Sequence, residues 1–454
     1  MPAERWRIRI VLGVGAILLA ALIIVAPALL TVDRYRPRVI SYLQQETGHQ
    51  VEIGRMALTL FPPTIHIEQF GVKNPPIFPA GYVVQVGRID AELNVGALFR
   101  QRRVIVKSLV LEEPVLHLTS DPDGPWNFEN PQATTSENAL PLPPTSTVQI
   151  KRGHVIASNL LPSDAQGPIF FEAHDVSCEL QHVNLVRILS RSAAPSGRHT
   201  EGTLKAGLLR LGAVEVSNLE SKVGMHARRV TFTEVKAAVY GGNAVGDLSF
   251  DLSGKTPRFE TTARLSGVNL ARLLAAFPSG GGKISGKMEG ELKLAGEIVY
   301  SLHPLAEIHG AGHVTVRNGQ MASIKLNANL MKLAHFNDLG PARDEPSSFK
   351  MISTDLELSN QRISSKVIDI DGYGVDVDGS GSVSVSGSDE LNYRGLAEIT
   401  TKEGFFTNTI ARLFSGATLK DGRLQFPFRI RGTIDNPVFS KGKGDKDVDA
   451  PKRR

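Results

Sequence analysis

From Gln50 onward, apolar residues recur at every second position in one short run after another. This period of two is typical of strands that turn one face to a core and the other to water. The clearest runs are Val51/Ile53, Leu58/Leu60, Ile65/Ile67, Val84/Val86, Ile89/Ala91/Leu93, Val104/Val106, Val115/Leu118, Val148/Ile150, Val375/Val377 and Leu424–Ile430. Prolines and glycines punctuate the pattern, which continues to about Phe439. The chain is therefore predicted to be mostly β.

A repeated phrase, in which a short glycine turn separates two strands, indicates how these strands connect. It occurs as IKRGHVIA, VRNGQMAS, LKDGRLQF and IRGTIDNP. The phrase predicts an elongated, curved antiparallel sheet that meanders, with few helical crossovers. Such a sheet has one apolar face that must be covered. It either closes on itself as a dry barrel or sandwich, or it leaves a groove for acyl chains.

Four short amphipathic helices are predicted, over residues 38–47, 270–277, 324–336 and 403–414. The last begins at Thr400-x-x-Glu403, which is a capping-box pattern. Its apolar stripe is the candidate site for contact with lipid or a membrane. The stripe consists of Phe405, Phe406, Ile410, Leu413 and Phe414. The alternative is that this helix docks on the core of the sheet.

The stretch from Ile10 to Val32 has no charged residue and is long enough to cross a membrane. A helix that rises about 1.5 Å per residue crosses a hydrocarbon core of about 30 Å in about 20 residues. The alternative is a cleaved signal peptide, because Ala26-Pro27-Ala28 resembles a cleavage site. Signal peptides usually have only about 7–15 apolar residues, and Leu29-Leu30 continue this run. The sequence therefore favours an uncleaved N-terminal transmembrane helix.

The net charge of +5 is concentrated at the ends of the chain. Residues 1–38 carry +4 and residues 441–454 carry +3, which leaves −2 for the body. A nucleic-acid-binding protein needs a basic face on its folded domain, so no nucleic-acid partner is expected. Basic ends suit anionic membrane surfaces instead. Cys178 is the only cysteine, so no intrachain disulfide can form.

Composition also divides the chain into regions. Residues 131–147 are polar, small and rich in proline, which predicts a linker or a long loop. The predicted organisation is a transmembrane anchor at 1–36, a β domain at 37–130, the linker, a middle β region at 148–264, a C-terminal β region at 265–440 and a charged tail at 441–454.

Three stretches imitate known binding sites without completing one. His174, Cys178 and His182 span about 26 Å on a strand, which is too far for one metal ion. Residues 376–387 begin like a calcium loop, but Gly387 stands where a bidentate glutamate is required. Their valines favour two strands around the turn Asp378-Gly-Ser-Gly381. Residues 281–288 resemble a phosphate-binding loop, but Met288 replaces its serine or threonine. We therefore predict no catalytic residue, no cofactor and no metal ligand.

Two regions of the chain each carry a set of recognisable sequence motifs. Residues 37–130 begin with a helix and TGHQVEIG, continue through Gly96-Ala97-Leu98 and end in PVLHLTSDPDGPWNFEN. The matching positions include Gly48, Ile53, Gly54, Pro62, Pro114, Asp123, Gly124, Trp126 and Asn127. Residues 265–440 contain LSGVNLARLLAAFP, SGKMEGELKLAG and DGRLQFPFRIRGTIDNPVFS. Both regions resemble the AsmA family of bacterial envelope proteins.

This resemblance implies a single-pass anchor in the bacterial inner membrane and a body in the periplasm. It also implies a groove-shaped β protein associated with lipid movement and outer-membrane biogenesis. The expected partners are the membrane, through the N-terminal helix, and phospholipid acyl chains; protein partners are not identified. A second hypothesis is an envelope assembly or scaffold protein that carries no lipid. An enzyme is the third and least favoured hypothesis.

Overall fold

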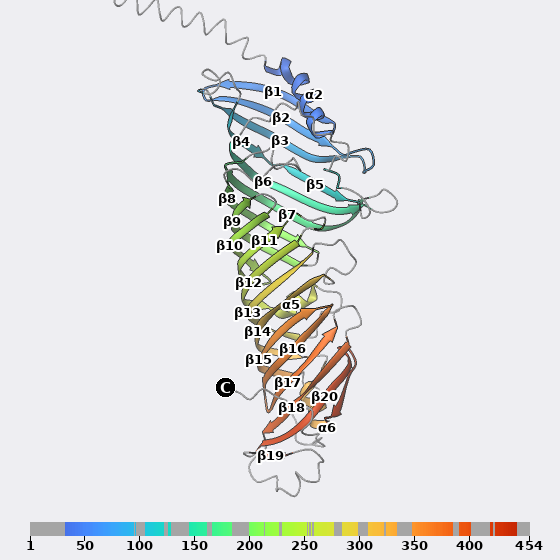
Figure 1. The fold of residues 1–454 in the computed structure, drawn as a ribbon. Helices are drawn as coiled ribbons and strands as arrows, with labels where there is room; N and C mark the ends of the chain where they lie inside the picture. The colour runs from blue at the N-terminus through green and yellow to red at the C-terminus, as the bar shows by residue number, and fades with distance from the viewer. Residues whose placement is uncertain are drawn as a thin grey trace, which may run out of the picture. The chain divides into compact units, whose positions relative to one another are not determined.

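A computed structural model gives the fold of the protein (Figure 1). It describes residues 32–94, 96, 105–121, 126–128, 145–160, 166–183, 199–212, 214–226, 229–251, 253, 256, 258–276, 284–297, 307–321, 324–333, 347–384, 390–400, 418–420 and 423–442. Apart from residues 32–36, the anchor predicted at 1–36 lies outside these residues. None of the helices that the structure describes is long and apolar enough to cross a membrane.

The chain divides into two compact units, Met1–Gly212 and Ala213–Arg454, here called unit 1 and unit 2. Both units consist mainly of β-strands, as the period of two predicts. In unit 1 the structure describes a short 3-10 helix, η1 (Val32–Tyr35), one α-helix, α2 (Arg36–Thr47), and eight strands. The strands are β1 (Val51–Leu60), β2 (Pro63–Lys73), β3 (Tyr82–Leu93), β4 (Val106–Glu112), β5 (Val115–Ser120), β6 (Thr145–Leu160), β7 (Gln166–Gln181) and β8 (Thr200–Leu211).

Helix α2 confirms the helix predicted over residues 38–47. Pro37 lies in its first turn, where a missing backbone N–H costs nothing. Gly48 ends the helix in the left-handed conformation, at φ 69°, and its N–H bonds to the carbonyl of Gln44. The apolar stripe of α2 packs on the start of β1, which buries one end of the sheet. The residues in contact include Val39, Ile40, Leu43, Val51, Ile53 and Met56.

The sheet of unit 1 is antiparallel except where β6 joins it. The first half of β6 pairs parallel with β4, from Val106↔Thr145, and its second half pairs parallel with β5. These parallel pairs were not predicted, since a meander has antiparallel neighbours only. This pairing also extends β6 at its start. The strand begins at Thr145, whereas the sequence predicted a strand from Val148. On its other side β6 pairs with β7, and β7 with β8, both antiparallel.

Unit 2 is an antiparallel meander. Its strands are β9 (Val214–His226), β10 (Arg229–Val239), β11 (Gly242–Asp251), β12 (Arg258–Asn269), β13 (Ile284–Glu297), β14 (Ile308–Met321), β15 (Ser347–Ser359), β16 (Arg362–Gly372), β17 (Val375–Ser384), β18 (Glu390–Thr400), β19 (Thr418–Lys420), β20 (Arg423–Thr433) and β21 (Pro437–Lys441). Each strand from β9 to β18 pairs with the next. Strand β20 then pairs with β18, β19 and β21.

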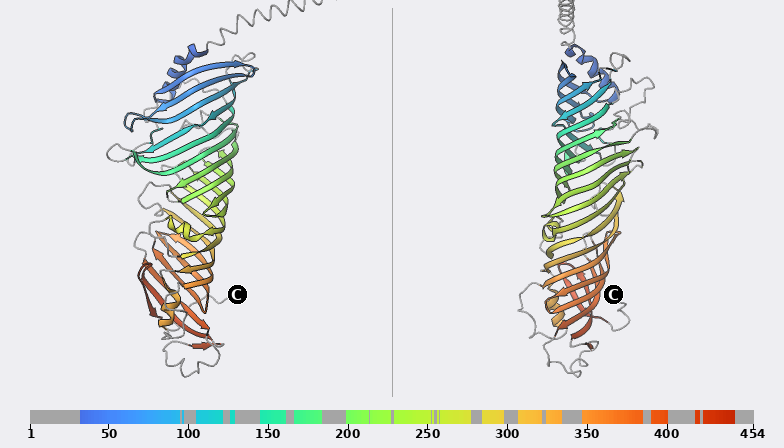
Figure 2. Two further views of the ribbon diagram at one scale, coloured as in Figure 1. Left: turned by 180° about the vertical axis from the view of Figure 1, so that it is seen from behind. Right: turned by 90° about the vertical axis from the view of Figure 1, so that its left-hand side faces the viewer.

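Two short helices pack on the sheet of unit 2 (Figure 2), α5 (Leu270–Ala275) and α6 (Leu326–Leu333). They confirm the helices predicted near residues 270–277 and 324–336. The side chain of Asn269 caps α5 by accepting the N–H of Arg272. Together with strands β12–β18 and β20, the helices form one buried hydrophobic cluster. Its most buried members are Val268, Leu330, Phe349, Val375 and Ala397. The helix predicted over residues 403–414 lies outside the described residues.

One local prediction is wrong. The turn expected at Asp378-Gly-Ser-Gly381 does not form, because β17 runs straight through it. Gly379 pairs with Gly395, and Gly381 pairs with Tyr393, on the neighbouring strand β18. A Cβ on Gly381 would lie closer than 3.0 Å to the carbonyl oxygen of Asn392. The two glycines therefore permit close strand packing here and do not mark a turn.

Candidate functional site

Strands β11 to β14 separate apolar and charged side chains onto two faces. Half-buried and exposed residues alternate strictly along β12 from Arg258 to Leu265. The charged face carries cross-strand ion pairs, between Arg258 and Glu297, Arg264 and Glu291, and Arg317 and Glu289. These pairs are exposed, so each adds little stability. The opposite face, here called the apolar face, carries Leu248, Phe250, Phe259, Leu292 and Leu294.

One row of residues crosses five strands on the apolar face. Phe232 pairs with Leu248 and Leu248 with Thr261. Thr261 then pairs with Leu294, and Leu294 with Gly310. Because paired residues point to the same side of a sheet, these five residues form a continuous path perpendicular to the strands. The path runs from β10 to β14.

A groove of about 390 Å³ follows this path. Its walls are made by Thr231, Phe232, Thr233, Asp247, Leu248, Ser249, Glu260, Thr261, Thr262, Lys293, Leu294, Ala295, His309 and Gly310. With neighbouring strands about 4.8 Å apart, five strands give the groove a length of about 19 Å. The volume lies within the range of about 300–1,000 Å³ that is typical of small-molecule sites.

Glycines keep the apolar face open at β13 and β14. A Cβ on Gly310 would lie closer than 3.0 Å to the carbonyl oxygen of Lys293, and a Cβ on Gly290 equally close to that of His313. Neither glycine requires a positive φ. The constraint is the close approach of the neighbouring strand, which leaves no room for a side chain. These positions therefore determine how tightly the strands can curve around the groove.

We expect Gly310→Val to destabilise unit 2 by about 1–3 kcal/mol, the usual cost of overpacking. The valine would collide with the backbone of β13 and with Leu294, whose side chain would lie 2.8 Å from a Cβ at position 310. Ala311→Val is the matched control, because Ala311 is the next residue of β14 and is exposed on the charged face. Thermal unfolding of both variants is the measurement. Equal melting temperatures would contradict a packing role for Gly310.

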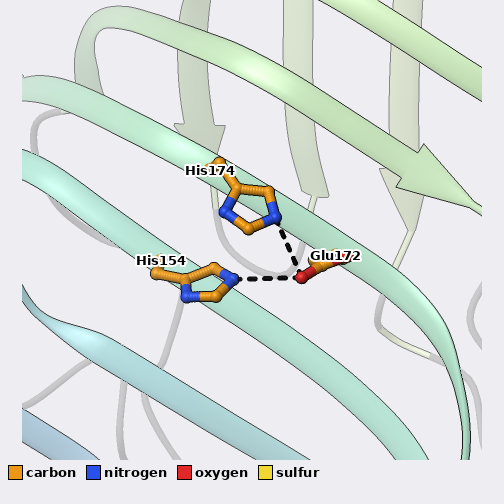
Figure 3. A group of neighbouring side chains, drawn as sticks. All are labelled: His154, Glu172 and His174. Carbon is orange, nitrogen blue, oxygen red and sulfur yellow. Dashed lines mark ion pairs between the residues drawn. The ribbon is translucent and has the colours of Figure 1, made fainter.

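A second cluster lies in unit 1, where β6 and β7 bring together His154, Glu172 and His174 (Figure 3). The Nε2 atoms of His154 and His174 lie 3.4 Å and 2.9 Å from Oε1 of Glu172. The imidazole rings stack, with centroids 4.1 Å apart. The left-handed residues Arg152, two positions before His154, and Asp175, directly after His174, are both at φ 52°, and the register of the two strands shifts there. The bulges therefore set where the rings meet.

Charged and titratable neighbours surround this cluster. Nη1 of Arg210, on β8, lies 3.5 Å from Oε2 of Glu172. Burial opposes ionisation of Glu172, but the charge of His174 and the close approach of both histidines outweigh it, so its pKa is lowered. The pKa of His117, on β5, is also lowered, by burial and by the charge of His154. At neutral pH Glu172 is therefore a carboxylate that faces imidazole nitrogens.

The structure separates the residues that the sequence had placed in one motif. His174 and Cys178 lie on β7, as predicted for a strand, and His182 is exposed beyond its end. Burial raises the pKa of the Cys178 thiol to about 11, so it is not a thiolate at neutral pH. His154 and Glu172 were missed by the sequence reasoning. Glu172 lies two residues before His174 on β7, so the period of two places both on one face. His154 joins them only through the register between β6 and β7, which no local pattern encodes.

The other residues considered from the sequence lie in strands or outside the described residues. Asp376, from the imitation of a calcium loop, pairs with Arg423 at 3.1 Å. Gly286, Lys287 and Met288, from the imitation of a phosphate-binding loop, lie within strand β13. Five residues proposed for lipid or membrane contact lie outside the described residues and stay a prediction. They are Phe405, Phe406, Ile410, Leu413 and Phe414.

Comparison with known protein families gives a match to the N-terminal part of the chain. The sequence model of the AsmA family matches residues 6–159, which include α2 and the strands from β1 through most of β6. The match confirms the resemblance for the N-terminal region. The similarity of residues 265–440 stays a prediction. No curated protein shows significant sequence similarity to the chain.

Proposed function

We propose that the chain is a bacterial envelope protein that binds or transfers phospholipid, because residues 6–159 match the sequence model of the AsmA family. The groove on the apolar face of unit 2 is the proposed acyl-chain site. The observation that carries this proposal is the row from Phe232 to Gly310, which crosses five strands and has aromatic, aliphatic or small residues at its floor. No catalytic step is part of the proposed role.

The dimensions of the groove support this occupant. Its length of about 19 Å exceeds half the thickness of a hydrocarbon core, about 15 Å, so one acyl chain fits along it. Each methylene that leaves water contributes about 0.8 kcal/mol. Ten methylenes would contribute about 8 kcal/mol, before the cost of association. Binding of this size is reversible, as a carrier requires.

Only part of the apolar face is covered by the cluster around α5 and α6. Leu265 and Leu292 pack against that cluster, whereas Phe232, Leu248 and Leu294 line the groove. A half-buried apolar surface next to a closed core suits a ligand that enters from one side. The closed core gives unit 2 its stability, and the groove remains free for the ligand.

The proposed location is the inner membrane, with residues 1–36 as a single anchor and the body in the periplasm. Its support is the uncharged run from Ile10 to Val32 and the family of residues 6–159. A role in outer-membrane biogenesis follows from the same family. The stripe from Phe405 to Phe414 would then contact lipid as a lid or at the membrane surface.

The test is native mass spectrometry of the full-length chain, released from mild detergent. We expect adducts with the masses of phospholipids, together with the same lipids in an organic extract of the purified protein. A photo-crosslinking amino acid at Leu294 should label lipid, whereas the same amino acid at Glu291 should not. Leu294 lines the groove, whereas Glu291 lies on the same strand and is exposed on the charged face.

The second candidate function is an envelope scaffold that carries no lipid. It predicts a protein without lipid adducts and equal, low labelling from Leu294 and Glu291. That outcome would reject the acyl-chain site while leaving the family of residues 6–159 unaffected.

A further inference from the structure

We propose that His154, Glu172 and His174 bind a divalent transition-metal ion, and that Zn²⁺ fits these ligands best. The three residues lie on adjacent strands of unit 1 and belong to no part of the proposed acyl-chain site (Figure 3). Among the residues that the structure describes, they form the one group of this kind.

The distances match a tetrahedral ion. Zinc binds histidine nitrogen and carboxylate oxygen at about 2.0–2.1 Å, so two ligand atoms of a tetrahedral site lie about 3.3 Å apart. Oε1 of Glu172 lies 3.4 Å from Nε2 of His154 and 2.9 Å from Nε2 of His174. All three ligand atoms lie within 4.8 Å of one another. Small side-chain adjustments would therefore place an ion between them.

The surroundings also suit a metal ligand set. Nε2 of His154 is buried and has no hydrogen bond of acceptable geometry, although it faces Glu172. Arg210 contacts the other carboxylate oxygen, Oε2, which holds Glu172 with Oε1 turned toward the histidines. An outer group that orients a ligating carboxylate is common in metal sites. The side chains of His154 and His174 are 29% and 35% exposed, so the cluster is in contact with solvent and a water molecule could take the fourth position.

The ligand types select the ion. Calcium and magnesium prefer all-oxygen sites, and two of these three ligands are nitrogen. Cu⁺ prefers thiolate and thioether sulfur, and Cys178 lies about 13 Å from His174 along β7. Two histidines, one carboxylate and an open position form a known arrangement for zinc. The site would join β6 to β7 beside the bulges at Arg152 and Asp175.

The experiment uses the full-length chain without a histidine tag, in detergent, after removal of metals with a chelator. Titration with ZnCl₂ in a calorimeter should show one strong site. Glu172→Gln keeps the size of the side chain and should weaken zinc binding by at least about tenfold, and His154→Gln or His174→Gln by at least about a hundredfold. Co²⁺ should give the visible absorption of a four-coordinate ion in the wild type, and the variants should lose it.

His182→Asn is the matched control, because His182 is exposed and lies at the end of the same strand. Asparagine tolerates the positive φ of that position. This variant should bind zinc as tightly as the wild type. Circular dichroism checks that each variant is folded. The proposal is wrong if the wild type shows no strong zinc site, or if folded Glu172→Gln and His174→Gln variants bind zinc unchanged.

Discussion

Replacing Leu248 and Leu294 together with glutamate should weaken phospholipid binding by about a hundredfold. Both side chains lie on the floor of the groove, two pairs apart in one row. Each buried leucine contributes about 1.5–3 kcal/mol to an apolar contact, and 1.4 kcal/mol corresponds to a factor of ten in affinity. Loss of both leucines should therefore lower the affinity for phospholipid by at least about a hundredfold. The carboxylates would also lose hydration on contact with an acyl chain.

This double variant should still fold, because Leu248 and Leu294 are only half-buried when the groove holds no ligand. Val245→Glu with Ala311→Glu is the control. It adds the same charge at exposed positions on β11 and β14. Binding of a fluorescent phospholipid to the full-length chain is the measurement. If both double variants lose binding equally, net charge is responsible and the groove is not the site.

The strands of this chain were predictable because local pattern and burial agree. The alternation around Leu248 and Leu294 specifies one charged face and one apolar face, and any register slip by one residue would exchange them. The helices α2, α5 and α6 were also predictable. Gly48 ends α2 in the left-handed conformation, as a glycine after an apolar stripe predicts.

Features that depend on pairing between distant segments were not predictable. The parallel joining of β6 to β4 and β5 brings Thr145 beside Val106, and nothing near either residue encodes it. The cluster around Glu172 depends on two bulges that fix the register of β6 and β7. Gly379 was predicted to lie in a turn, because glycine is common both in turns and where two neighbouring strands approach closely. The row of residues along the groove could not be predicted either, because it depends on the pairing register of five strands.

We expect Leu330→Ala to have the largest effect on stability, a loss of about 2–5 kcal/mol in the free energy of unfolding. Leu330 has no exposed surface, and it lies in the same buried cluster as Phe349. Removing its side chain leaves a cavity between α6 and the sheet, and an eight-residue helix has little stability of its own. The loss should therefore appear first at α6 and at β15 and β21, the strands it contacts.

The choice of probe decides whether this loss can be seen. Both tryptophans, Trp6 and Trp126, belong to unit 1, so tryptophan fluorescence does not report on α6. Hydrogen exchange read by mass spectrometry resolves the two units separately. Protection in α6 and β15 should fall by at least about thirtyfold, since 1.4 kcal/mol is a factor of ten, while β2 and β3 stay unchanged. Val438→Ala, whose side chain is 61% exposed, should change the stability by less than about 0.5 kcal/mol. Equal protection in the Leu330→Ala variant and the wild type would show that α6 does not hold the core of unit 2 together.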